Sequence, residues 1–338
     1  MARKPSIKTE TKSSLLQALE FCSVVCEKLG APHETHISLR NNMAIAFNGV
    51  IAAGAHIVED IYCCPHTILM IEALSKCTDN YSLTQLDNGR LSIKSGKFKA
   101  IVPCIEPNLI EITQPDPLIV SITNKFKEAI EAVGVLASEN AQHVLTASIL
   151  MNGQSVISTN RLMLFEYWHG LDLPSNIPLP KQFVVALAKQ KKNLTGFGFS
   201  NSSATFYFED NCWLKTQLYS DEWPDVSRIL NIEANLWNID PNFFEALSAI
   251  APFSETGNVY SDTNLLMSHP EASLGATHEC TGIPKGFIYP IKQLMMMKSH
   301  VKKIDYMANG ISQSQSYCLK FEGDRLRGVI SGRKRVNS

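Results

Sequence analysis

The stretch LKTQLYSDEWPDVSRIL, residues 214–230, decides how the chain is divided. It begins with the alternation of a β-strand, and the alternation stops at the corner Trp223-Pro224. Proline fixes φ and has no amide hydrogen to donate, so it ends strand pairing. An apolar pair, Ile229-Leu230, follows almost at once. The stretch therefore predicts the exit from one domain into the next. The alternative is an ordinary strand-ending turn with Trp223 as a core anchor.

The composition is typical of a globular protein with two or three domains: 338 residues, 45% hydrophobic and 19% charged. The net charge of −1 neither favours nor excludes nucleic acid, because a neutral protein can still carry a basic stripe. The N-terminus lacks the apolar core of a secretory signal, and no run approaches the roughly 18 apolar residues of a membrane helix. The lack of such a run predicts no membrane partner, and nine scattered cysteines predict reduced thiols in the cytoplasm.

Outward from this stretch, the sequence repeats one order of elements three times. Each repeat predicts an amphipathic helix, alternating strands, a second helix and a hairpin. The first helices are expected at 11–28, 124–138 and 240–253, the second helices at 63–76, 178–191 and 289–303, and the hairpins at 81–104, 196–220 and 316–332. This order predicts α+β domains, with helices on one face of a mostly antiparallel sheet, at residues 1–115, 116–230 and 231–338.

Three short motifs carry a family resemblance. EWPDVSRIL (222–230) is similar to a Phe-Pro-Asp-Tyr-x-Arg-Val-Leu motif, with Trp223 in place of the phenylalanine. STNRLMLFE (158–166) resembles Thr-Asp-Gly-His-Arg-Leu-Ala through Arg161 and Leu162, although Thr159-Asn160 replaces Gly-His. DNGRLSIKSGKFKAIVP (87–103) resembles the first-domain hairpin of the same family. That family is the bacterial DNA polymerase III beta subunit, the sliding clamp, and the repeats extend the resemblance over nearly the whole chain.

The resemblance implies three tandem DNA-clamp domains, with antiparallel sheets outside and helices lining a ring. Two copies would close the ring around double-stranded DNA and tether a DNA polymerase, without sequence specificity, and a clamp loader ATPase would open it. The protein would act in the cytoplasm of a bacterium, or of the host cell if a phage encodes it. The alternatives are a repeat scaffold that is not a clamp, or an enzyme with an unrecognised site.

DNA contact in such a ring needs ammonium groups that neutralise phosphates without reading bases. The resemblance assigns this role to lysines on the expected helices and at their ends. For each lysine, the alternative is an ordinary solvated helix face. The predicted DNA-binding residues are Lys28, Lys125, Lys127, Lys189, Lys191, Lys192, Lys298, Lys302 and Lys303.

The resemblance also implies an apolar pocket for a partner peptide between the second and third domains. The alternative is that the same residues pack an interdomain core. The chain departs from the family at its end, where GVISGRKRVNS (328–338) replaces an apolar tail. The predicted pocket residues are Leu145, Ile157, Arg161, Leu162, Pro224, Arg228, Ile229, Val329 and Ile330.

Ring closure would pair edge strands of the first and third domains, since unpaired edges are templates for pairing. By position in the family, the ring interface includes Ala100, Val102 and Phe253. The alternative is a different closure, or a monomer that closes only on loading.

The sequence predicts no catalytic residue, metal or cofactor. CCPH (63–66) lacks the second ligand pair of a zinc site, so small buried cysteines are the expected interpretation. No phosphate-binding glycine loop, zinc-protease motif or nucleophile elbow is present. We therefore expect a protein that is not an enzyme.

Overall fold

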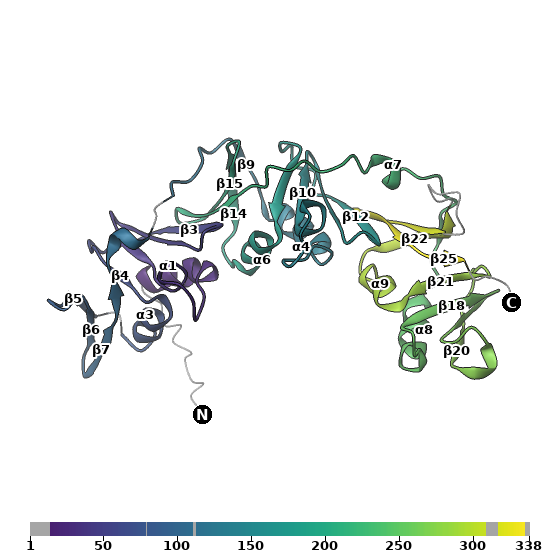
Figure 1. Cartoon of the computed structure of the whole chain (residues 1–338), viewed down its shortest axis with the longest axis horizontal. Helices are drawn as coiled ribbons and strands as arrows, with labels where there is room; N and C mark the ends of the chain where they lie inside the picture. Colours follow the sequence, from purple (N-terminus) through teal and green to yellow (C-terminus); the bar gives the residue numbers. More distant parts are fainter. Residues whose placement is uncertain (1–13, 79, 111–112, 309–316, 335–338) are drawn as a thin grey trace, which may run out of the picture. The chain divides into compact units, whose positions relative to one another are not determined.

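The computed structural model describes residues 14–78, 80–110, 113–308 and 317–334 (Figure 1). The chain forms two compact units: Met1–Lys127 with Val185–Ser220, and Glu128–Val184 with Asp221–Ser338. Within the described ranges, no helix combines the length and the apolar character that crossing a membrane requires. The boundaries at residues 115 and 230 stay a prediction, because each compact unit combines segments of more than one repeat.

The expected order of elements occurs three times along the described chain. The first helices are α1 (Ser14–Cys22), α4 (Asn124–Gly134) and α8 (Phe243–Ile250). Three antiparallel strands follow each: β1 (Ser38–Arg40), β2 (Met43–Phe47) and β3 (Ile51–His56); β10 (Ser148–Asn152), β11 (Ser155–Thr159) and β12 (Met163–Trp168); β18 (Asn258–Asp262), β19 (Leu265–Met267) and β20 (Thr277–Glu279).

The second half of each repeat begins with a short fourth strand, β4 (Cys64–Pro65), β13 (Ile177–Pro180) or β21 (Phe287–Pro290). The second helices come next: α3 (Thr67–Leu74), α6 (Lys181–Lys189) and α9 (Ile291–Met296). Three further strands close each repeat: β5 (Ser82–Gln85), β6 (Leu91–Ser95) and β7 (Phe98–Val102); β14 (Leu194–Phe199), β15 (Ser203–Phe208) and β16 (Cys212–Gln217); β22 (Val301–Ala308), β23 (Cys318–Gly323) and β24 (Leu326–Ser331).

Two large antiparallel sheets join strands of neighbouring repeats. In the first unit the order is β1-β2-β3-β16-β15-β14-β9, where β9 is Val120–Ser121. In the second unit it is β13-β10-β11-β12-β24-β23-β22-β17, where β17 is Trp237–Asn238. In each sheet, the third strand of one repeat pairs with the last strand of the following repeat: β3 with β16, and β12 with β24. This bears out the predicted α+β class with mostly antiparallel sheets.

The junction of β3 and β16 depends on close backbone approach. Trp213 and Gly54 are register partners, and a Cβ on Gly54 would overlap the Trp213 ring. Only glycine leaves room for the indole at this position, so a substitution there would push the two strands apart.

Helices cover sheets in both units with their apolar faces. Helix α1 packs on β2 and β3, as Figure 1 shows for β3, and it buries Leu15, Leu16 and Leu19. In the second unit, α8 packs on β19 and β20 and buries Phe243 and Leu247. Burying one such side chain contributes roughly 1.5–3 kcal/mol, which explains why the 3.6-residue spacing was a sound guide to these helices.

Smaller sheets complete the two units. Strands β5-β6-β7 form one sheet, and β4 pairs with β8 (Cys104–Ile105), both in the first unit. The order β20-β19-β18-β21-β25, where β25 is Arg333–Lys334, forms the other in the second unit.

The predicted second helices are too long. Residues 178–180 belong to β13 and Pro65 to β4, because both segments pair with neighbouring strands before the helix begins. The expected helix 289–303 is wrong beyond Met296: a turn follows, and β22 starts at Val301. Burial of Ile304, Tyr306 and Ala308 at every second position is the strand signal that the lysines of KSHVKK obscured.

Candidate nucleic-acid interface and partner pocket

Hydrogen bonds tie three helix ends together in the first unit, with Gln190 at their centre. The Gln190 carbonyl accepts a hydrogen bond from Lys127 Nζ, and its side-chain amide donates to the carbonyl of Phe21 at 3.0 Å. Asn124 at the start of α4 adds a 3.0 Å bond from the Leu194 amide to its Oδ1 and a 2.6 Å bond from its Nδ2 to Asn193 Oδ1. The end of α1, the start of α4 and the end of α6 therefore meet.

This junction gathers five of the predicted DNA-binding lysines. Lys125, Lys189 and Lys191 are exposed around it. Lys127 is half-buried and holds Gln190, and Lys192 lies 2.5 Å from Asp210 Oδ2. Burial alone would lower the pKa of Lys192, but its hydrogen bond to Asp210, together with the neighbouring Cys212 and the carboxylate charge, outweighs that effect and raises this pKa. Lys125, Lys189 and Lys191 are thus the ammonium groups of this set available to a phosphate.

The other predicted lysines do not lie on helices. Lys28 is exposed in the loop after the 3-10 turn Ser23–Val25, and Lys298 is exposed in the turn after α9. Lys302 and Lys303 lie on β22, and Lys302 pairs with Asp324 at 2.5 Å. The helix placement of these two lysines was wrong, because the period-two burial of β22 overrides their basic character.

A cavity of about 420 Å³ opens beside the Trp-Pro corner in the second unit. The segment Trp223–Leu230 forms one wall, and β10 and β11 form another through Leu150 and Ile157. Leu150, Ile157, Leu164, Val226 and Leu230 make a buried apolar cluster, with Trp223 packed against it. Trp223 Nε1 donates a hydrogen bond to Ser148 Oγ at 2.9 Å. This bond fixes the indole at the point where the linker begins. The Trp223 anchor and the predicted domain exit are therefore compatible.

No protein-family description matches the chain, and no characterised relative matches it by sequence. Solved structures match over nearly its whole length. A DNA polymerase III beta subunit from Pseudomonas aeruginosa superposes with a TM-score of 0.75 at 13% identity, covering 96% of this chain and 98% of that one. The chain has the fold of the DNA polymerase III beta sliding clamps.

Two further structures with the clamp fold agree. The Helicobacter pylori beta clamp bound to a DNA ligase peptide has a TM-score of 0.74 at 17% identity, covering 94% of this chain and 97% of that one. A DNA polymerase III beta subunit described as putative, from Eubacterium rectale, reaches 0.79 at 12% identity, with coverage of 95% and 97%. The predicted resemblance is confirmed at the level of the fold.

Within the clamp fold, the predicted pocket residues separate by exposure. Ile157 and Pro224 line the cavity. Leu162 and Ile229 are 52% and 38% exposed, and both flank β24: Leu162 accepts a hydrogen bond from the Ser331 amide, and α7 (Ser227–Leu230) packs on that strand. Arg161 and Arg228 are exposed, and Leu145 is half-buried on α5 (Val144–Ala147).

The last two predicted pocket residues lie in the core of this clamp fold. Val329 packs in a buried cluster with Ile232 and Ala308, and Ile330 is fully buried. A peptide bound beside β24 would meet Leu162 and Ile229 rather than these side chains.

Arg161 is held in a left-handed conformation at φ 73°. Asn160 Oδ1 accepts hydrogen bonds from the amides of Leu162 and Met163 at 3.1 and 2.8 Å, and Thr159 Oγ1 accepts one from the Arg161 amide at 3.0 Å. The polar turn that replaces Gly-His therefore forces a strained residue to project from the β11–β12 corner.

Sequence reasoning missed Glu166 and Arg327, which also line this cavity. Glu166 is 6% exposed on β12, and Arg327 Nε donates to its Oε2 at 2.7 Å. The signal that could have found them is a carboxylate inside the apolar strand MLFEYW, which needs a buried cation.

The predicted ring-interface residues lie on an end strand and in an exposed turn. Ala100 and Val102 lie on β7, the end strand of its sheet, with Ala100 half-buried and Val102 fully buried. Phe253 is 62% exposed in the 3-10 turn Ala251–Phe253 after α8.

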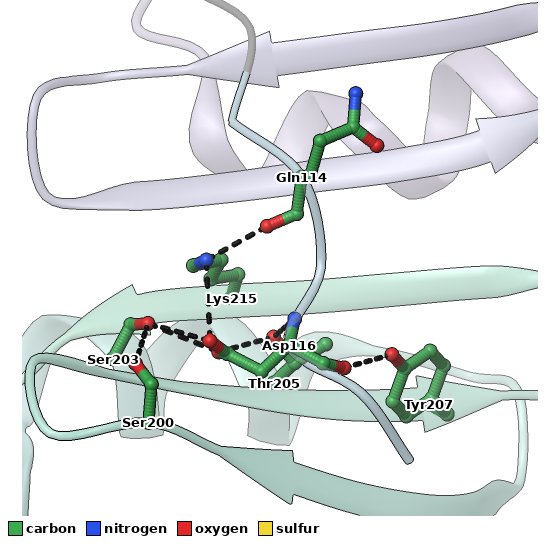
Figure 2. A network of polar contacts seen from close by, with 7 residues as sticks. All are labelled: Gln114, Asp116, Ser200, Ser203, Thr205, Tyr207 and Lys215. Carbon is green, nitrogen blue, oxygen red and sulfur yellow. Dashed lines mark hydrogen bonds and ion pairs between the residues drawn. The ribbon is translucent and has the colours of Figure 1, made fainter.

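A second polar cluster missed by the sequence fixes the linker into the second repeat (Figure 2). Asp116 is 5% exposed and accepts hydrogen bonds from Ser203 Oγ and Thr205 Oγ1, each at 2.8 Å. Lys215 Nζ lies 3.4 Å from Asp116 Oδ1 and donates to the Gln114 carbonyl at 2.7 Å. Tyr207 donates to the Asp116 carbonyl. Because its oxygens are occupied within the protein, this carboxylate is structural.

Proposed function

We propose that this chain is a DNA sliding clamp, a processivity factor that encircles double-stranded DNA without sequence specificity. Two copies close a ring, tether a DNA polymerase and are opened by a clamp loader ATPase. The observation that carries the proposal is the gathering of Lys125, Lys189 and Lys191 at joined helix ends in a chain with the clamp fold. Exposed ammonium groups without base-reading partners suit a duplex that must slide.

The proposal includes three clamp domains at residues 1–115, 116–230 and 231–338. The threefold order of elements supports these boundaries. A clamp performs no catalysis and needs no cofactor, and it acts in the cytoplasm of the cell that replicates the DNA, whether that cell is a bacterium or the host of a phage.

Ring closure follows from the pairing rule inside the chain. The third strand of a repeat pairs with the last strand of the next, as β3 does with β16 and β12 with β24. In both junctions the first residue of the third strand lies opposite the next-to-last residue of the last strand. Ile51 of β3 faces Thr216 of β16, and Met163 of β12 faces Ile330 of β24. Strand β20 and strand β7 each end a sheet of the described residues.

Applied to two copies, this rule pairs β20 of one with β7 of the other. Thr277 then faces Ile101, His278 faces Ala100, and Glu279 faces Lys99. The exposed side chains of Glu279 and Lys99 give this pairing opposite charges, which favours cross-strand partners. In this proposed pairing Ala100 and Val102 belong to the interface strand β7, and Phe253 stays a predicted interface residue in the exposed turn after α8.

The partner pocket is proposed at the Trp-Pro corner. The Helicobacter pylori clamp holds a DNA ligase peptide, and a Pseudomonas aeruginosa clamp holds griselimycin. Here the exposed apolar side chains of Leu162 and Ile229, with Arg161 and Arg228 exposed, suit a short apolar peptide with an acidic group.

The deciding experiment measures topological retention. The protein is loaded on nicked circular DNA, and its release is followed after the circle is linearised. A clamp stays on the circle and leaves the linear form, whereas a scaffold or an enzyme that binds DNA ordinarily dissociates from both at the same rate. Equal release from both forms would refute the proposal.

The basic cluster is tested in the same assay. Changing Lys125, Lys189 and Lys191 to Gln should reduce retention at low salt and make the salt dependence of binding shallower, by up to roughly 0.9 in the log–log slope for each phosphate that is no longer neutralised. Lys285→Gln, which removes an exposed lysine paired with Asp262, is the control and should leave retention unchanged. Wild-type retention by the triple variant would remove these lysines from the interface.

A further inference from the structure

The second unit contains another cavity, of about 1040 Å³, which shares no lining residue with the partner pocket. Its walls are the segment Glu233–Pro241, the loop Thr281–Pro284 and the end of β22 from Ile304 to Ala308. The segment includes β17, the end strand of the eight-stranded sheet in the described residues. One edge of β17 pairs with β22, and the other edge is unpaired there.

The cavity lining is acidic. Glu233, Asp240 and Asp305 contribute carboxylates, and the described lining contains no Lys, Arg or His. Backbone amides orient two of them: Asn235 and Met307 donate to the two oxygens of Asp305 at 2.8 and 2.9 Å.

Asp240 is held in the same way. The amides of Asn242 and Thr281 donate to its Oδ1 and Oδ2 at 2.9 and 2.6 Å. The hydrogen bond from the Asn242 amide is the main cause that lowers the pKa of Asp240, with the Thr281 amide adding to it. This carboxylate is therefore anionic at neutral pH, in an orientation fixed by the backbone.

Three neighbouring lysines have partners outside the cavity lining. Lys320 Nζ donates to the Ile232 carbonyl at 2.9 Å and lies 3.9 Å from Glu322. Lys285 pairs with Asp262, and Lys302 pairs with Asp324. Lys320 faces Asp305 across β23 and β22, and the exposed Lys303 faces Asn238 of β17. The described lining itself is acidic, so it favours a cationic ligand and repels a nucleic-acid phosphate.

Trp237 supplies an aromatic surface at the same place. Its side chain is 74% exposed, although the residue lies in β17 opposite Ile304. An exposed indole face attracts an ammonium or guanidinium group, and an unpaired strand edge accepts the backbone of an extended peptide.

We propose that this cavity binds an extended segment of a partner protein that carries Arg or Lys. The segment adds along the unpaired edge of β17, with a cationic side chain over Trp237 and another near Glu233 and Asp305. The site shares no residue with the proposed DNA interface or partner pocket, so the clamp fold would carry two peptide sites of different chemistry in its second unit: one apolar and one acidic.

The test uses a fluorescein-labelled decapeptide of alternating Arg and Val, with a Glu–Val decapeptide of the same length for comparison. Fluorescence anisotropy should show binding of the basic peptide alone. Trp237→Ala should weaken it about fivefold, and Glu233→Gln about two- to threefold, with wild-type thermal unfolding. Leu274→Ala, which removes another exposed apolar side chain of the same unit, is the control and should bind normally.

Indole ¹⁵N–¹H signals locate the peptide. The signal of Trp237 should move on addition of the basic peptide, while that of the buried Trp213 stays in place. Equal binding of both peptides, wild-type affinity of Trp237→Ala, or movement of the Trp168 signal without that of Trp237 would overturn the proposal. Retention of Trp237→Ala on circular DNA is measured in parallel, and it should equal wild type, so failure here is distinguishable from failure of the clamp function.

Discussion

Arg327 and Glu166 are register partners across the junction of β24 and β12, and Arg327 Nε lies 2.7 Å from Glu166 Oε2. Ser155 Oγ donates to the other carboxylate oxygen at 2.8 Å, and the guanidinium lies 4.7 Å from the centre of the Trp168 ring. The pair therefore joins the second and third repeats, with both charges satisfied, at the wall of the proposed partner pocket.

Removing the Arg327 cation alone should lower the stability of the protein. Arg327→Met leaves the Glu166 carboxylate buried without its partner, so the free energy of unfolding should fall by about 3 kcal/mol. Arg327→Met combined with Glu166→Gln should recover at least half of that loss. Urea denaturation followed by circular dichroism gives both values, and additive losses in the double variant would contradict an energetic coupling.

Asp116 should contribute more to stability than an exposed aspartate with a shorter ion pair. Asp116→Asn places an amide against the hydroxyls of Ser203 and Thr205 and should lower the free energy of unfolding by about 2–3 kcal/mol. The control is Asp210→Asn, which breaks the 2.5 Å exposed pair with Lys192 and should cost no more than about 0.5 kcal/mol. Equal effects in urea denaturation would show that the network of Figure 2 adds nothing.

The strained Arg161 separates stability from binding. Arg161→Gly and Arg161→Ala both remove the guanidinium, but only glycine adopts a positive φ at no cost. The free energy of unfolding of the Gly variant should therefore exceed that of the Ala variant by about 0.5–1 kcal/mol. Both should weaken binding of an octapeptide with a Leu-Phe pair and one Asp, measured by calorimetry. Unchanged affinity in both variants would place the peptide elsewhere.

Stability should fall in mild acid because of His169. This side chain is 3% exposed, and burial is the main cause that lowers its pKa from 6.5 to about 4, against a smaller opposing effect of the Ser155 backbone. The unfolded chain binds the proton first, so the free energy of unfolding should decrease by about 2 kcal/mol as pH falls from 6.5 to 4. His169→Gln should flatten this dependence, and His143→Gln, an exposed control, should not. A wild-type slope in His169→Gln would assign the acid sensitivity to other groups.

Charge reversal tests the proposed pairing of β7 and β20. Lys99→Glu should weaken self-association about tenfold, because Glu279 of the other copy would then face a like charge. Lys99→Glu with Glu279→Lys should restore it, while Lys285→Glu should have no effect. Sedimentation equilibrium measures the dissociation constant, and failure of the double reversal to restore the dimer would rule out this register.

Some of the site was readable in the sequence. The lysines of KQKK stood out by charge density, and the structure brings them to Lys125 and Lys127 through Gln190. Sequence reasoning could not see that Lys192 is held by Asp210, since that contact depends on how β15 turns into β16. It also overextended the helix into KSHVKK, because lysine suits a helix surface and a strand edge alike.

The proposed partner pocket was also only partly predictable from the sequence. The Trp-Pro corner and the Arg161 turn follow from local chemistry: proline ends pairing, and Asn160 bonds the two amides beyond its neighbour. The partner of Glu166 lies 161 residues away, and no periodicity in the sequence indicates which cation will face a buried carboxylate.

The sequence by itself determined the threefold order of helices and strands, because amphipathic spacing and turn residues act over a few neighbouring positions. Only the tertiary structure decided which strands of different repeats share a sheet, which lysines remain exposed and where the acidic cavity lies. Strand edges offer the same amides and carbonyls everywhere, so their pairing is selected by distant packing, such as Trp213 over Gly54, that local sequence does not encode.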